Sequence, residues 1–150
     1  MSTTKRDGLI RHYAASHRDP RNEAIHCVCV PAIVFAVIGF LFYVNIGLTL
    51  MAIAAAVIYY SRFSPLAAVE MAVILILMMA AWLMLMPTHH ILLAAAAIFI
   101  LAWIGQFIGH AYEGAKPSFF EDVQYFMIGP LFILAVLKNR VLGSSTLPTL

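Results

Sequence analysis

Charged residues are scarce in this sequence of 150 residues, which contains nine lysines and arginines and seven aspartates and glutamates. Charged residues make up 11% of the chain and hydrophobic residues 63%, whereas a soluble domain has about 25% and about 45–50%. This composition excludes a disordered chain, and the net charge of +2 is too small to indicate a nucleic-acid partner. A chain this short cannot bury so much apolar surface in one globule. We therefore predict a single integral membrane domain, residues 1–150, in contact with a lipid bilayer.

Cysteine is scarce as well, and the two cysteines, Cys27 and Cys29, are separated by one residue. On a helix or in an extended segment their side chains diverge, so they cannot easily form a disulfide bond with each other. This excludes a secreted scaffold held together by disulfide bonds. We interpret both as small buried thiols at a membrane boundary.

Long apolar runs occupy most of the chain, and a membrane-crossing helix needs about 20 such residues. The runs predict membrane helices at residues 28–44, 46–60, 66–86, 91–110 and 119–137. They lack alternation and are rich in Ala, Leu, Ile and Met, which favours helices over barrel strands. The predicted fold class is therefore all-α, a multi-pass transmembrane bundle of four or five helices. The fifth contains Gly129 and Pro130 and could be kinked or re-entrant.

The segment before the first apolar run is polar on one side only. Apolar residues recur at helical spacing over residues 8–17, which predicts an N-terminal amphipathic helix at the membrane interface. Asp19 and Pro20 are typical of a helix start, and Pro31 is expected to bend that helix just past His26. Five basic residues precede the first run and predict a cytoplasmic N-terminus: Lys5, Arg6, Arg11, Arg18 and Arg21.

The few polar residues near the apolar runs form two groups. Asn22 and His26 are four residues apart and lie on one helix face. The second group lies on one stripe at the end of the fourth run: Trp103, Gln106, His110 and Glu113. The predicted topology places both groups, together with His17, at the cytoplasmic face of the membrane.

Three imidazoles and a carboxylate at one membrane face favour a site for iron, zinc or manganese. An alternative stays open, in which these side chains lie at the interface or hydrogen-bond neighbouring helices to each other. His89 and His90 fall on the opposite surface in this topology, and we interpret them as loop residues.

Two sequence blocks resemble a known family. Residues 13–26 read YAASHRDPRNEAIH and residues 103–117 read WIGQFIGHAYEGAKP, followed by GPLF at 129–132. These blocks are similar to the signatures of the membrane dioxygenases that shorten 2-hydroxy fatty acids, whose founding member is named for metabolism of phytosphingosine to odd-numbered fatty acids. The family usually has a Glu six residues after Pro130, where this chain has Val136. That Glu is therefore dispensable as a ligand here, or the activity of this chain is altered.

The resemblance implies an Fe(II)-dependent dioxygenase that uses O₂ without 2-oxoglutarate. A 2-hydroxy fatty acid would lose its carboxyl carbon and give a fatty acid one carbon shorter. The assigned site residues are the metal ligands His17, His26 and His110, the ligand or orienting residue Glu113, the hydrogen-bonding residues Asn22 and Gln106 behind the ligands, and Tyr13, which would contact substrate or oxygen. Replacing His89 by alanine should have little effect.

The resemblance also implies a bacterial inner membrane or the endoplasmic reticulum as the location. The sequence leaves open whether the chain forms a homo-oligomer. Two other functions compete with the dioxygenase: a metal-dependent membrane lipid hydrolase or hydroxylase, and a non-catalytic lipid-binding or transporter-like membrane protein. A transporter would need an ionisable residue deep in the membrane, and the firm spans contain only Glu70, near one end.

Overall fold

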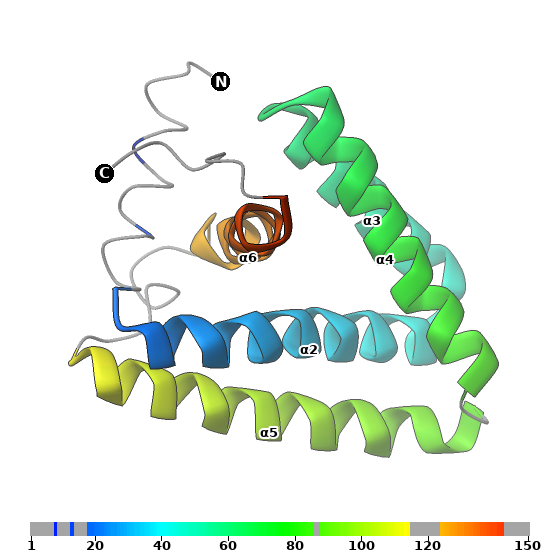
Figure 1. The fold of residues 1–150 in the computed structure, drawn as a ribbon. Coiled ribbons are helices and arrows are strands. Elements are labelled where there is room, and N and C mark those ends of the chain that lie inside the picture. Colours follow the sequence, from blue (N-terminus) through cyan, green and yellow to red (C-terminus); the bar gives the residue numbers. More distant parts are fainter. Residues whose placement is uncertain (1–7, 9–12, 14–17, 86–87, 115–123, 143–150) are drawn as a thin grey trace. The chain divides into compact units, whose positions relative to one another are not determined.

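The computed structural model describes residues 8, 13, 18–85, 88–114 and 124–142. Helices account for nearly all of these residues, and no strand occurs among them (Figure 1). The helices are α2 (Pro20–Val44), α3 (Ile46–Ser61), α4 (Pro65–Leu85), α5 (Thr88–Glu113) and α6 (Gln124–Leu142). The predicted all-α class is confirmed for this part of the chain. The predicted interfacial helix falls outside it except for Gly8 and Tyr13, which both have helical backbone.

Three helical segments are long and apolar enough to cross a membrane, judged by length and composition: Pro20–Val44, Pro65–Met84 and His90–Glu113. The other two apolar segments, Ile46–Ser61 and Tyr125–Lys138, are shorter. The expected count of four or five crossings therefore stays a prediction, as does the cytoplasmic N-terminus. Large apolar side chains such as Met84 and Leu93 are mostly exposed on these helices, which suits contact with lipid rather than water.

Helix α2 begins where the sequence predicts a helix start. The Asp19 carboxylate accepts a hydrogen bond from the Arg21 amide at 2.7 Å, and the Asp19 carbonyl accepts one from the Glu23 amide at 3.0 Å. Asp19 is thus the capping residue and Pro20 the first helical residue, as expected. Pro31 lies inside α2 and does not end it, because the helix continues to Val44.

A single residue separates α2 from α3. Asn45 has an extended backbone, with φ −168° and ψ 133°, and its side-chain oxygen accepts hydrogen bonds from the amides of Gly47 and Leu48 at 2.7 and 3.2 Å. These bonds satisfy amides that have no partner inside the new helix. The polar interruption between the two apolar runs is therefore a helix cap.

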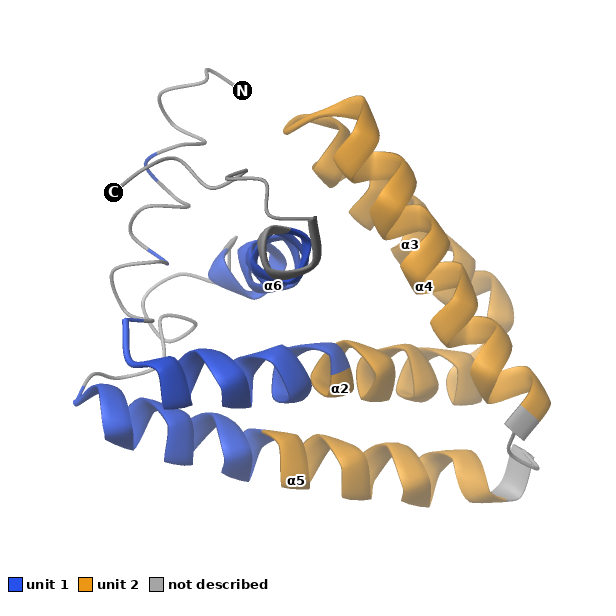
Figure 2. Ribbon diagram, viewed as in Figure 1, with its two compact units in different colours: residues 1–31, 103–150 blue, residues 32–102 orange. Residues whose placement is uncertain are grey.

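The chain divides into two compact units, shown in Figure 2. Unit 1 comprises residues 1–31 and 103–150, and unit 2 comprises residues 32–102. Both boundaries fall inside continuous helices, α2 and α5, which lie side by side in each unit. Unit 1 thus contains the amino end of α2, the carboxyl end of α5, and α6.

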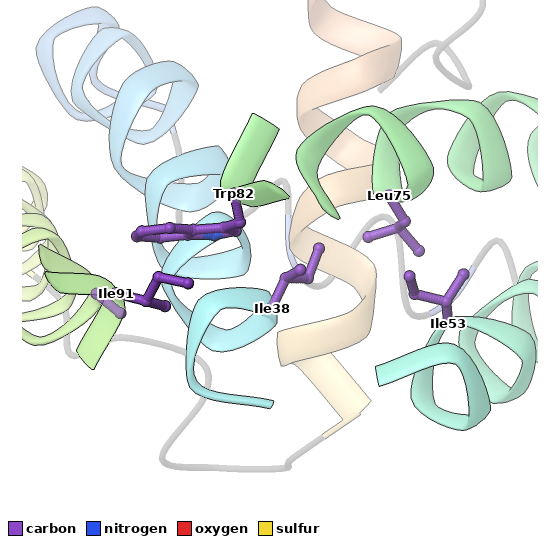
Figure 3. Close-up of a cluster of buried hydrophobic side chains, with 6 residues drawn as sticks. Ile38, Ile53, Leu75, Trp82 and Ile91 are labelled. Carbon is purple, nitrogen blue, oxygen red and sulfur yellow. The ribbon is translucent and has the colours of Figure 1, made fainter. Parts of the chain in front are cut away.

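Unit 2 is held together by an apolar cluster contributed by four helices (Figure 3). Its buried members are Ile38, Ile53, Leu75, Trp82, Ile91 and Ala95. The Trp82 ring stacks on Phe35 with ring centroids 4.5 Å apart, and its indole nitrogen donates a hydrogen bond to the Phe35 carbonyl at 2.9 Å. The indole is therefore buried without losing a partner for its N–H group.

Gly39 gives the Trp82 ring its space, so Gly39→Ala should destabilise the protein. A Cβ atom at Gly39 would lie 2.6 Å from two atoms of that rigid ring. We expect a loss of about 1–3 kcal/mol from overpacking, against a gain of about 1 kcal/mol in helix propensity. Thermal unfolding in detergent micelles measures the net effect. Adding Trp82→Phe, which shortens the ring, should recover part of the loss, whereas an unchanged unfolding temperature for Gly39→Ala would contradict this packing.

Candidate functional site

Two buried histidines face each other in unit 1. His26 comes from α2 and His110 from α5, and their side chains are 1% and 4% exposed. Their Nε2 atoms are 3.2 Å apart, and the rings meet edge to face with centroids separated by 4.8 Å. Two imidazoles that are 84 positions apart in the sequence thus form one polar pair inside an apolar helix pair.

Backbone contact settles the tautomer of His26. Its Nδ1 atom lies 2.9 Å from the carbonyl oxygen of Asn22, one turn earlier on α2. A carbonyl oxygen can only accept a hydrogen bond, so Nδ1 carries the proton and donates it. In the neutral ring the Nε2 atom is then unprotonated, and its lone pair is directed toward His110. This is the arrangement in which metal-binding histidines are commonly held.

The distance between the two Nε2 atoms suits two arrangements. In one, His110 donates a hydrogen bond from its Nε2 to the Nε2 of His26. In the other, both lone pairs bind one metal ion. Metal–imidazole bonds of about 2.0–2.1 Å put adjacent ligand nitrogens about 3.0 Å apart at right angles and about 3.4 Å apart in a tetrahedron. The observed 3.2 Å lies between these values.

A metal ion would need further ligands beyond this pair. Within the described ranges, no group of three or more His, Cys, Asp or Glu side chains is placed to hold one. The third predicted ligand, His17, lies outside the described residues. The histidine pair therefore fits part of a metal site, and imidazole donors suit iron, zinc, copper or nickel.

The carboxylate of Glu113 is directed at the start of α2. One of its oxygens, Oε1, accepts a hydrogen bond from the Arg18 amide at 2.9 Å. The other, Oε2, accepts from the Asp19 amide at 2.9 Å and from the side-chain amide of Asn22 at 3.0 Å. Asn22 is fully buried, so its amide group is stabilised by this charged acceptor.

Two glycines on α5 allow the site helices to approach closely. A Cβ atom at Gly105 would lie 2.5 Å from the sulfur of Cys29, and one at Gly109 would lie 2.6 Å from the Asn22 side-chain oxygen and 3.4 Å from the His26 ring. The sequence analysis missed both residues. Their spacing of four, GQFIG at residues 105–109, was the available signal, because small residues at this spacing are typical of close helix contacts in membranes.

The remaining described site residues take separate places in unit 1. Gln106 is buried one turn before His110 on α5. Tyr13 is buried against α6, with its ring 5.2 Å from that of Phe132 and 6.3 Å from that of Tyr125. Burial raises the pKa of the Tyr13 phenol, so the side chain is neutral and able to donate at physiological pH. Its assigned contact with substrate or oxygen stays a prediction.

Basic side chains lie near the exposed end of the site helices. Arg18 and Arg21 are exposed at the start of α2. The Arg21 guanidinium lies 5.4 Å from the centre of the Tyr112 ring on α5, within the range of a cation–π contact.

Val136, at the position where the resemblance leads us to expect Glu, is buried on α6. Cys27 and Cys29 are both half-buried, so the expectation of buried thiols was wrong.

Comparison with known proteins gives a family match. The model of a family described as "2-hydroxy-palmitic acid dioxygenase Mpo1-like" matches residues 4–141, which is most of the chain. The matched range contains the histidine pair and all other assigned site residues. No curated protein and no solved structure matches the chain.

Proposed function

The chain belongs to the 2-hydroxy-palmitic acid dioxygenase Mpo1-like family, and from this premise we propose that it is an Fe(II)-dependent enzyme of fatty acid α-oxidation. It converts a 2-hydroxy fatty acid and O₂ to the fatty acid one carbon shorter. The single observation that supports this most is the buried His26–His110 pair, because two nitrogen lone pairs at this separation suit neighbouring positions on one metal ion.

The reaction balances with O₂ as the only oxidant. The bond between the carboxyl carbon and the hydroxyl-bearing carbon breaks, the carboxyl carbon leaves as CO₂, and the hydroxyl-bearing carbon becomes the new carboxyl group. This oxidation releases four electrons, which one O₂ molecule takes up completely. The products are the shortened fatty acid, CO₂ and one molecule of water, which together contain both oxygen atoms of O₂. No 2-oxoglutarate or external reductant is needed.

His26 and His110 would hold the metal, with His17 as the proposed third ligand. Iron held by these residues would supply the redox chemistry that activates O₂ for reaction with the hydroxy acid. The chain itself fixes the His26 ring through its hydrogen bond to the Asn22 carbonyl. The burial of both histidines excludes bulk water, which would otherwise compete for the same sites.

The carboxylate and the acyl tail of the substrate suit two different surfaces of the protein, one basic and one apolar. The guanidinium groups of Arg18 and Arg21, exposed beside the start of α2, would hold the carboxylate before it is lost. The acyl tail would lie along the exposed apolar side chains of the helices or among the lipids they contact. The substrate would thus reach the site from the bilayer, with its head at the membrane surface.

Purified protein tests this proposal with 2-hydroxypalmitate under air. We expect O₂ uptake and CO₂ release in a ratio of one to one, with pentadecanoate as the acid formed. Removing the metal with a chelator should abolish turnover. Loading the protein with Fe(II) under anaerobic conditions and then admitting air should restore it. Palmitate, which lacks the hydroxyl group, is the matched control substrate and should give no O₂ uptake.

Other outcomes would identify a different function. Metal-dependent turnover of another lipid without O₂ uptake would indicate a membrane hydrolase. A protein that retains no transition metal after gentle purification and binds none on titration would indicate a non-catalytic lipid-binding or transporter-like protein. Either result would overturn the proposed dioxygenase.

A further inference from the structure

We infer that Glu113 is a positioning residue of this site and not one of its metal ligands. Its carboxylate clamps the start of α2 to the end of α5 and thereby sets the register in which His26 faces His110. The inference rests on the proposed function, since it concerns the metal site that the function requires.

The hydrogen bonds of Glu113 commit both of its oxygens to α2. Oε2 accepts from two donors, the Asp19 amide and the Asn22 side-chain amide, which together use the lone pairs of that oxygen. Oε1 accepts from the Arg18 amide. Donors on α2 thus use three of the roughly four lone pairs of the carboxylate, and a metal ion could bind only through Oε1, which already accepts from the Arg18 amide.

The position of the carboxylate is set by the ends of the two helices. Helix α5 ends at Glu113, and the next residue, Gly114, has a positive φ of 70°, the left-handed conformation in which glycine commonly ends a helix. Helix α2 begins at Pro20, so its positive dipole end lies next to the Glu113 carboxylate. The charge of Glu113 is therefore stabilised where it is by the amide groups that open α2.

A closed chain of contacts connects this clamp to the histidines. Glu113 accepts from Asn22, the Asn22 carbonyl accepts from Nδ1 of His26, and Nε2 of His26 lies against Nε2 of His110. His110 is three residues before Glu113 on α5, which closes the circuit. A shift of α2 along α5 would break the clamp and separate the two Nε2 atoms together.

Exchanging the two clamp residues distinguishes positioning from ligation. In Glu113→Gln, the side-chain NH₂ group takes the place of one carboxylate oxygen. In either orientation of the side chain it then faces an N–H donor of α2, and at least one hydrogen bond is lost. In Asn22→Asp, two carboxylates face each other. The double variant Asn22→Asp/Glu113→Gln restores a donor facing an acceptor between the two side chains. We expect each single variant to lose about 10- to 100-fold in Co(II) affinity, measured by the visible absorption of the bound ion. The double variant should recover part of that loss, because the two side chains again pair a donor with an acceptor while the Asp19 amide loses its acceptor.

The opposite pattern would overturn the inference. If Glu113 is a ligand, Glu113→Gln and the double variant lose Co(II) affinity alike, and the absorption bands of any bound ion change because an oxygen ligand is gone. The matched control is Glu23→Gln, which removes a carboxylate from the same first turn of α2 but keeps the clamp. It should bind Co(II) within a fewfold of the wild type.

A second measurement on metal-free protein separates this inference from the proposed function. Glu113→Gln should speed amide hydrogen exchange at Arg18 and Asp19, whose amides donate hydrogen bonds to the Glu113 carboxylate, and Glu23→Gln should not. Unchanged exchange in Glu113→Gln would overturn the clamp, whether or not the wild type binds metal. Faster exchange in a protein that binds no metal would leave the clamp standing and overturn the proposed function alone.

Discussion

His26→Ala and His110→Ala proteins should each lose all measurable turnover of 2-hydroxypalmitate and most of their bound iron. Each substitution removes one of the two buried nitrogens whose separation suits a shared metal ion. In His110→Ala the remaining imidazole cannot supply a second bond, because its other nitrogen is bound to the Asn22 carbonyl. Iron content by mass spectrometry and O₂ uptake measure the two effects.

The matched control for these variants is His90→Ala. His90 lies on the same helix as His110, but near its start and with an exposed side chain. We expect wild-type iron content and turnover from this protein. Normal activity in His110→Ala would overturn the assignment of the pair as ligands.

Thermal unfolding separates ligation from simple hydrogen bonding between helices. A bound metal stabilises the folded state by mass action, so wild-type protein should unfold at a higher temperature with iron than without it. In His110→Ala this difference should disappear. If the histidines only hydrogen-bond α2 to α5, the substitution would lower the unfolding temperature equally with and without metal, and chelation would leave the wild type unchanged.

Gly109→Ala should be strongly damaging although it removes no functional group. The added methyl carbon would lie 2.6 Å from the Asn22 side-chain oxygen and 3.4 Å from the His26 ring, both buried. Since neither side chain can move without breaking its own hydrogen bonds, we expect a net loss of about 1–3 kcal/mol in stability. Metal binding should weaken in parallel, because displacing Asn22 disturbs its hydrogen bonds to Glu113 and to the His26 ring.

Gly8→Ala is the matched control, because a Cβ atom at Gly8 has no neighbour within 4 Å in the part of the chain that the structure describes. Alanine favours a helix over glycine by about 1 kcal/mol, so this protein should be as stable as the wild type or more so. Unfolding temperature and Co(II) titration compare the two variants. A Gly109→Ala protein that matched Gly8→Ala in both measurements would show that α2 and α5 do not approach as closely at this point.

Local sequence patterns were sufficient for the helices and for their polar faces. Asp19 and Pro20 predicted the start of α2, and the apolar runs predicted where the other helices lie. The stripe of Gln106, His110 and Glu113 was readable because residues three and four apart share a helix face. These features depend on nearby residues alone, and the sequence contains them in full.

The pairing of side chains across helices was decided by the tertiary structure. The sequence left Glu113 as either a ligand or a residue that orients His110, whereas the fold directs its carboxylate to the amides of Arg18 and Asp19. It also did not indicate that Gly105 and Gly109 make room for Cys29, Asn22 and His26. Contacts of this kind join residues more than 70 positions apart and depend on how closely two helices approach and in which register.

The sequence by itself thus indicated a helical, strongly apolar chain with the imidazoles and the carboxylate assigned to the site in two short blocks, since composition and periodicity are local properties. Only the tertiary structure decided that His26 presents its unprotonated nitrogen to His110 at 3.2 Å. That geometry arises from the hydrogen bond to Asn22 and from the close packing of α2 on α5, which no residue specifies alone.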